Sequence, residues 1–240
     1  VLEFLISSFK QKTKLEVYES LKKKNPDIKL NIVPHMYFGK FNKFKKIPKF
    51  FFPASGISDS LILDCNEDGF YSKFKTDRFG FNNDNQEWEK DVFEYVLVGD
   101  SFIQGACVNE PDTIAGNLRS KVNNKSGVLN LGLGGNGPLL QYVILRQYVN
   151  QKIKVKRILF FYYEGNDIDG LNNELTNPTL SKYVEDLNFS QDLIKNQQIT
   201  DKLLKQILFN ELENIKSNNK NIALSQNSFF RFIKLSNLRK

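Results

Sequence analysis

Histidine, methionine and cysteine are scarce in this chain of 240 residues, which has one histidine, one methionine and two cysteines. Cys65 and Cys107 have no metal-ligand spacing, so the sequence indicates no metal site. The two thiols leave two alternatives open, either inert buried cysteines or a single disulfide in an exported protein. The sequence has no internal repeat.

The apolar run at residues 2–9 is too short to cross a bilayer. It is followed by Lys10, Lys12 and Lys14, so it could end a transmembrane or signal segment, or form the first turns of a soluble helix. Because the chain begins with Val1 rather than methionine, we expect a fragment and favour the membrane interpretation. The expected location is the extracytoplasmic side of the cell envelope, with an N-terminal membrane anchor.

The composition, 40% hydrophobic and 13% aromatic, is sufficient for a folded core. A net charge of +7 would suit a nucleic-acid partner, but Lys, Asn, Ile and Phe are abundant together, as in proteins of AT-rich genomes. We therefore expect no nucleic-acid partner. Lysines alternate with phenylalanines at residues 37–52, which would also suit single-stranded nucleic acid or a membrane surface. We favour a half-buried strand or loop with solvated lysines there.

The secondary-structure pattern divides the chain into an N-terminal extension, residues 1–90, and an α/β domain, residues 91–240. In the extension, residues 10–24 predict a helix ending at Asn25, and residues 61–82 predict short β-hairpins. The domain alternates strands with helices, which predicts a parallel sheet covered by helices on both faces. Its expected strands are 93–98, 128–131 and 157–163, and its expected helices are 112–121, a segment after Pro138, 200–216 and 229–238.

Each expected strand of the domain ends in a polar or glycine-rich segment, where ligands bind in parallel sheets. A phosphate loop is excluded because Gly99 and Gly105 are one residue too far apart and no lysine follows. The G-x-S-x-G nucleophile motif fails at Ile103. Glycines 132, 134 and 137 match the dinucleotide motif G-x-G-x-x-G, but no acidic residue follows at residues 153–157, so no cofactor is expected.

Acyl transfer fits the three strand ends, because it needs a nucleophile and hydrogen-bond donors for a developing oxyanion. Ser101 lies where a strand gives way to a helix, which lets its hydroxyl and backbone N–H face one centre. A glycine in the second segment allows a close backbone N–H. The side-chain NH₂ of Asn166 is a third donor.

Three sequence blocks resemble, in order and spacing, those of the SGNH or GDSL-type serine hydrolases: GDSF at 99–102, NLGLGGNG at 130–137 and EGND at 164–167. The resemblance covers residues 92–170. It implies a flavodoxin-like sheet and ester hydrolysis, with Ser101 as nucleophile and first oxyanion donor. Gly135, or Gly134 if the loop is shifted, would be the second donor and Asn166 the third. We interpret Asp100 and Asp167 as carboxylates that brace the loops.

The chain departs from this family because the Asp-x-x-His block that supplies the base is absent. The only histidine, His35, precedes the sheet, and we interpret it as structural. Three strands are few for an open α/β sheet. We therefore expect that the domain is incomplete at its C-terminus, rather than a relative without catalysis, and that the chain as given has essentially no esterase activity dependent on Ser101.

The expected function is a serine esterase or O-deacetylase that acts on a small acyl ester or acylated cell-surface glycan through an acyl-serine intermediate. Two alternatives remain open. One is an SGNH-type O-acyltransferase for polysaccharide, which product analysis with an added acceptor would identify. The other is a noncatalytic module that binds a glycan or a membrane surface.

Overall fold

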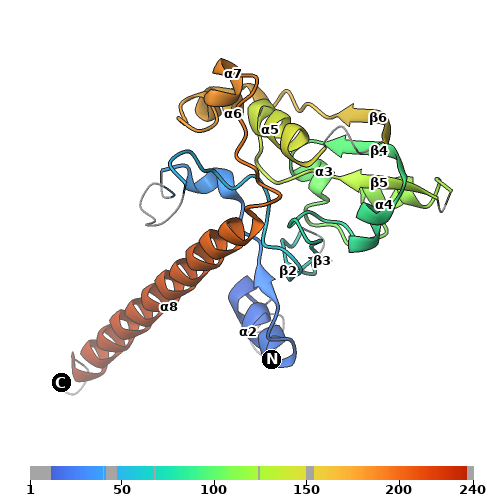
Figure 1. Cartoon of the computed structure of the whole chain (residues 1–240). Helices are drawn as coiled ribbons and strands as arrows, with labels where there is room; N and C mark the ends of the chain where they lie inside the picture. The colour runs from blue at the N-terminus through green and yellow to red at the C-terminus, as the bar shows by residue number, and fades with distance from the viewer. Residues whose placement is uncertain are drawn as a thin grey trace.

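The computed structural model contains two three-stranded sheets (Figure 1). It describes residues 12–39, 41, 48–67, 69–123, 125–149 and 154–236, with side chains as far as residue 217. The first sheet consists of β1 (Lys29–Leu30), β2 (Leu61–Leu63) and β3 (Lys73–Lys75). The second consists of β4 (Val92–Val98), β5 (Ser126–Asn130) and β6 (Lys154–Phe160). The helices are α2 (Lys14–Lys24), η1 (Pro34–Tyr37), η3 (Asn85–Glu89), α3 (Ser101–Gln104), α4 (Ile114–Arg119), α5 (Pro138–Tyr148), α6 (Asp167–Leu175), α7 (Lys182–Glu185) and α8 (Gln197–Ser236).

The second sheet is parallel throughout, with the strand order β5-β4-β6, as the alternation of strands and helices predicts. Leu97 of β4 pairs with Asn130 of β5 on one side and with Leu159 of β6 on the other. The carboxyl ends of the three strands therefore lie side by side at one edge, and the segments that follow them are neighbours.

Helices cover both faces of this sheet, which confirms the α/β layer prediction. Successive β4 residues point to opposite faces: Val96 belongs to the hydrophobic cluster of Val143 on α5, whereas Leu97 packs in the cluster of Ala115 on α4. All four side chains are fully buried. Burying each of the larger ones stabilises the fold by about 1.5–3 kcal/mol.

The N-terminal region forms the first sheet and α2. A capping box between Thr13 and Glu16 begins α2, and the helix ends at Asn25 as predicted. In the sheet, β2 pairs antiparallel with β3, but β1 pairs parallel with β2, an arrangement that the short β-prone runs did not predict. The hydrophobic core continues from this region into the second sheet, since Tyr18 and Phe52 belong to the same cluster as Val96.

Cys65 and Cys107 form a disulfide, so the alternative of two inert thiols is wrong. The bond joins the segment after β2 to the turn after α3, across 42 residues of sequence. The same junction is braced by Asp64, whose Oδ2 accepts a hydrogen bond of 3.2 Å from the Cys107 N–H. The disulfide thus ties the N-terminal region to the segment that follows Ser101.

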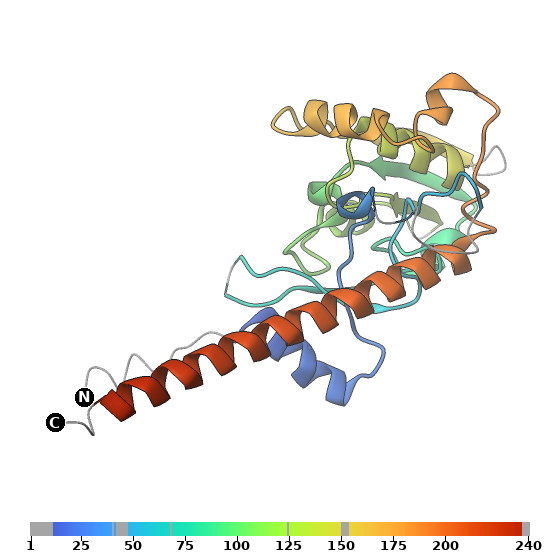
Figure 2. The same ribbon diagram turned by 90° about the vertical axis from the view of Figure 1, so that its left-hand side faces the viewer.

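The helix α8 corrects the prediction of two separate helices at 200–216 and 229–238. It is one helix of 40 residues that leaves the body of the molecule and extends alone to its end (Figure 2). No glycine or proline interrupts its sequence, which explains why the helix continues through the polar residues between the two predicted segments. At 1.5 Å per residue it is about 60 Å long.

Two other boundaries differ from the sequence prediction. The strand β6 ends at Phe160 rather than at residue 163, and the chain then turns toward α6. The helix α4 begins after residue 112 because Thr113 caps it, accepting a hydrogen bond of 3.0 Å from the Gly116 N–H.

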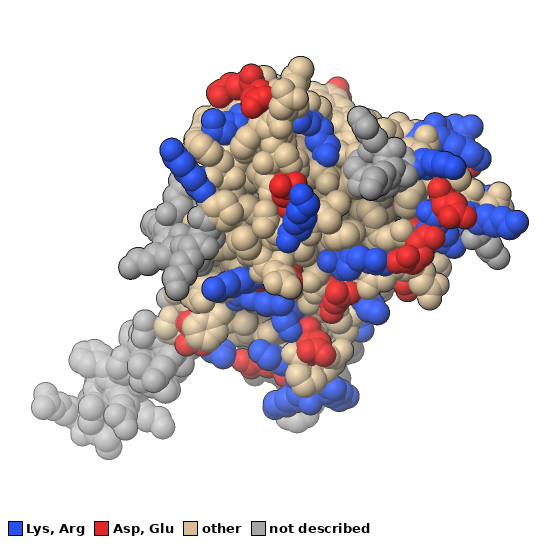
Figure 3. Space-filling model, in the orientation of Figure 1, with Lys and Arg blue, Asp and Glu red and all other residues tan. Residues whose placement is uncertain are grey.

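Within the described residues, none of the helices is both long and apolar enough to cross a membrane. The apolar run at residues 2–9 and the middle of the Lys/Phe segment, residues 42–47, lie outside the described residues. On the face drawn in Figure 3, basic and acidic side chains are interspersed rather than separated by sign.

Candidate active site

The three sequence blocks follow three adjacent parallel strands, and hydrogen bonds continue the pairing just beyond the strand ends. The Leu131 N–H donates to the Leu97 carbonyl at 2.8 Å, and the Phe161 N–H donates to the Val98 carbonyl at 2.8 Å. The Gly-Asp-Ser turn, the glycine-rich loop and the Glu-Gly-Asn turn therefore begin at one edge of the sheet. This edge is the candidate active site.

Ser101 is half-buried and is the first residue of α3. The residue that caps the helix is Asp100, whose Oδ1 accepts a hydrogen bond of 3.0 Å from the Phe102 N–H. Burial raises the pKa of the Asp100 carboxyl, with the nearby Asp167 adding to the shift. At the start of a helix the Ser101 N–H has no intrahelical acceptor. Its hydroxyl and its N–H are thus available on the same residue.

Two buried amides hold the glycine-rich loop. The Asn130 side chain accepts from the Gly132 N–H at 2.9 Å and donates to the Ile103 carbonyl at 2.8 Å. The Gln104 Oε1 accepts from the Gly134 N–H at 2.8 Å. These bonds attach the loop to α3, the helix that begins with Ser101.

Gly134 and Gly135 differ in the state of their N–H groups. The Gly134 N–H is already bonded to Gln104, whereas the Gly135 N–H has no hydrogen-bond partner among the described residues. A Cβ on Gly134 would lie 3.9 Å from the Ser101 Cβ, so the loop passes directly beside the serine. Among the described residues the loop N–H without a partner is therefore that of Gly135, which favours Gly135 over Gly134 as the second donor.

Asn166 occupies the cap position of α6 and is exposed, and its side chain makes no capping hydrogen bond. The adjacent Asp167 is buried, and its Oδ2 accepts from the Tyr163 N–H at 2.8 Å, which braces the turn as predicted. The Tyr163 ring contacts the Phe102 ring, with centroids 5.4 Å apart. This contact connects the Asn166 turn to the helix of Ser101, and the Asn166 amide has no hydrogen-bond partner in the part of the chain that the structure describes.

Glu174 is a buried carboxyl that lies outside the three sequence blocks. From α6 it accepts three backbone hydrogen bonds at the start of α5: from Gly137 at 2.6 Å, Leu139 at 2.9 Å and Leu140 at 3.2 Å. Burial outweighs these bonds and raises the Glu174 pKa to about 7. The residue joins the end of the glycine-rich loop to the helix that Asn166 begins.

We expect Glu174→Gln to reduce the free energy of unfolding by about 1–3 kcal/mol, because one carboxylate oxygen becomes an NH₂ that cannot accept from a buried N–H. The measurement is urea unfolding at about pH 8.5, where a carboxyl with a pKa of about 7 is ionised. Asp169→Asn on the exposed side of the same helix is the matched control. Equal stability of the two variants would contradict the proposed importance of these three bonds.

His35, which we interpret from the sequence as structural, contacts the glycine-rich loop at the candidate site. The short helix η1 carries it onto the glycine-rich loop, where its ring occupies the space that a Cβ of Gly135 would need. The absence of a recognisable motif around His35 in the sequence gave no sign of this placement.

The glycines that match the dinucleotide motif serve close packing. A Cβ on Gly132 would overlap the Gln104 backbone, and one on Gly137 would lie 2.9 Å from Gly170. Close packing within the fold therefore explains why both positions are glycine. Among the described residues no group of three or more His, Cys, Asp and Glu side chains could hold a metal ion.

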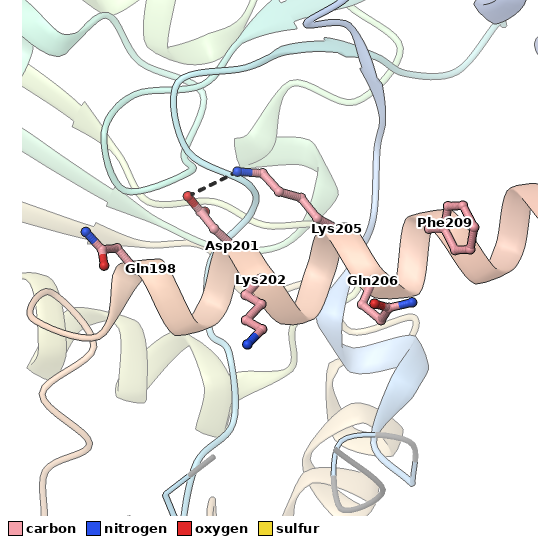
Figure 4. A pocket seen from close by; sticks show the side chains of 6 residues that line it. All are labelled: Gln198, Asp201, Lys202, Lys205, Gln206 and Phe209. Atoms are coloured by element: carbon pink, nitrogen blue, oxygen red, sulfur yellow. Dashed lines mark ion pairs between the residues drawn. The ribbon is translucent and has the colours of Figure 1, made fainter. Parts of the chain in front are cut away.

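A cavity of about 640 Å³ lies along α8 and is lined by none of the residues of the three sequence blocks (Figure 4). Its lining residues are Gln198, Asp201, Lys202, Lys205, Gln206 and Phe209. Asp201 accepts from the Ser58 N–H at 2.9 Å and pairs with Lys205 at 3.7 Å, so its carboxylate is engaged in the fold. The strand-end edge, with a serine and free donors, has the better chemistry for a reaction.

Neither family models nor curated proteins nor solved structures give a match to this chain. The function must therefore be argued from the strand-end site itself.

Proposed function

We propose that this chain carries the serine nucleophile and oxyanion site of an SGNH-type esterase or O-deacetylase. The observation that supports it best is the position of Ser101 at the start of α3, beside a loop whose Gly135 N–H is free. The parallel sheet between two helical layers is compatible with the flavodoxin-like fold that the sequence resemblance implies.

In the proposed reaction, the Ser101 Oγ attacks the carbonyl carbon of an acyl ester and its proton passes to a base. The carbonyl oxygen becomes an oxyanion that receives hydrogen bonds from the N–H groups of Ser101 and Gly135 and from the Asn166 NH₂. The C–O bond to the alcohol then breaks, and the alcohol leaves with the proton. Water attacks the acyl-serine in the second half of the reaction and releases the carboxylic acid.

The proposed substrate is a small acyl ester, with acylated cell-surface glycans as a natural class, and the proposed location is outside the cytoplasm. The Cys65–Cys107 disulfide supports this location, because such bonds persist in oxidising compartments. The N-terminal anchor stays a prediction from residues 2–9.

The test is covalent labelling of Ser101 in the full-length gene product with a fluorophosphonate, which forms a bond to an activated serine. We expect one phosphonate per chain, on the peptide that contains Ser101, by mass spectrometry. Ser101→Ala should remove the label, and Ser120→Ala, at an exposed serine, should retain it. Absence of label at Ser101 in the wild type, with intact fold, would refute the proposed function.

A further inference from the structure

His35 contacts the glycine-rich loop through the face of its ring. Gly135 has φ = +72°, a left-handed conformation that side chains rarely adopt, and the His35 ring fills the space where its Cβ would be. The ring thus lies against the residue that has the free N–H beside Ser101. It comes from η1, in the N-terminal region, 100 residues earlier in the sequence.

The ring also bonds to the loop. A backbone hydrogen bond with Gly134 raises the His35 pKa, as expected where the ring donates to a carbonyl, but burial lowers the pKa more strongly. The net pKa is below the ordinary value, which favours the neutral imidazole. The Nδ1 atom is buried without a partner among the described residues, so we assign the interaction with Gly134 to Nε2.

Gly134 is therefore held on both sides. Gln104 of α3 accepts a hydrogen bond from its N–H, and His35 of η1 interacts with its backbone. The Gly134 carbonyl and the Gly135 N–H belong to one planar peptide group. Holding the backbone of Gly134 therefore also sets the direction of the Gly135 N–H. A donor helps an oxyanion only when its direction is set before the reaction.

We propose that His35 is a positioning residue of the oxyanion site, which together with Gln104 orients the Gly134–Gly135 peptide so that the Gly135 N–H faces the reacting oxygen. This inference rests on the proposed function, because the oxygen belongs to the acyl group on Ser101. His35 acts through Gly135 and takes no proton from Ser101.

The experiment compares His35→Gln with His35→Ala in the full-length gene product, using hydrolysis of a simple acetyl ester. Glutamine keeps an N–H donor for Gly134 but cannot accept a catalytic proton. We expect His35→Gln to retain kcat within about threefold, and His35→Ala to lower kcat by about tenfold to 100-fold with little change in KM, since small misplacements have such effects. Met36→Ala, at a 66% exposed position of the same η1 helix, should match the wild type.

Two outcomes would overturn the proposal. If His35→Gln loses as much activity as Ser101→Ala, the imidazole is needed as a proton acceptor and not for positioning. If His35→Ala has wild-type kcat, the contact has no catalytic effect. Fluorophosphonate labelling of the wild type separates these outcomes from failure of the proposed function, because an unlabelled Ser101 would reject both proposals together.

A second measurement covers the case that His35→Ala is poorly folded. His35 is the only histidine, so its ring nitrogens give unambiguous NMR signals in the 240-residue chain. We expect a neutral ring protonated on Nε2, and a change of the Gly135 amide shift in His35→Ala but not in Met36→Ala. A ring protonated on Nδ1 would contradict the assigned bond to Gly134 and overturn the proposal.

Discussion

Replacing Asn166 by alanine in the full-length gene product should lower kcat for ester hydrolysis by about 10²-fold to 10³-fold and leave the fold intact. Asn166 is exposed and its amide bonds to none of the described residues, so its removal costs the native structure little. Of the three proposed oxyanion donors it is the one that a substitution can delete, because the others are backbone N–H groups.

The measurement is steady-state kinetics on an acetyl ester, with urea unfolding as the check on the fold. Asn166→Asp sharpens the test, because it preserves the shape and replaces the donor by a carboxylate, so it should lose at least as much activity as the alanine variant. Asn172→Ala, at an exposed position of the same helix, should behave as wild type. A wild-type kcat for Asn166→Ala would remove this residue from the site.

The second large effect is on stability. Replacing Cys65 and Cys107 together by serine should lower the free energy of unfolding by about 4 kcal/mol, because the disulfide closes a loop of 42 residues and restricts the unfolded chain. The measurement is guanidinium unfolding of the 240-residue chain without reductant. The wild-type chain in reductant is the matched control and should approach the stability of the double variant. Coincident unfolding curves for the oxidised wild type and the double variant would show that the bond contributes nothing.

The order of strands and helices in the second sheet could be predicted because local patterns determine it. Apolar runs such as Val92–Val98 end in polar turns, and Pro138 begins a helix as its fixed φ allows. The parallel pairing of β1 with β2 could not be predicted, because two residues of strand carry no periodicity and their partners lie 33 residues away.

The residues of the candidate site likewise fall into two groups, those that local sequence patterns indicate and those whose position depends on the fold. The segments of Ser101, Gly135 and Asn166 were expected at one edge because each block follows a strand, and the structure brings these segments together; the roles of the three residues stay predictions. Gln104 and Glu174 were missed, since a single glutamine or glutamate in a helical sequence is usually solvated, and only the fold reveals that these two are buried. The position of His35 depends on a contact between residues 100 apart, which no local pattern encodes.

The N-terminal region also supplies buried amides to the site. The Asn82 side chain donates to the Gln104 carbonyl at 2.8 Å, and Asn83 both donates to the Asn130 carbonyl and accepts from its N–H, each at 2.9 Å. A chimaera that joined residues 91–240 to an unrelated leading segment would leave these buried groups without partners, at about 1–3 kcal/mol for each. The two regions are therefore not interchangeable modules. A substitution at residue 82 or 83 would remove hydrogen bonds to residues 104 and 130, whose side chains hold the loop beside Ser101.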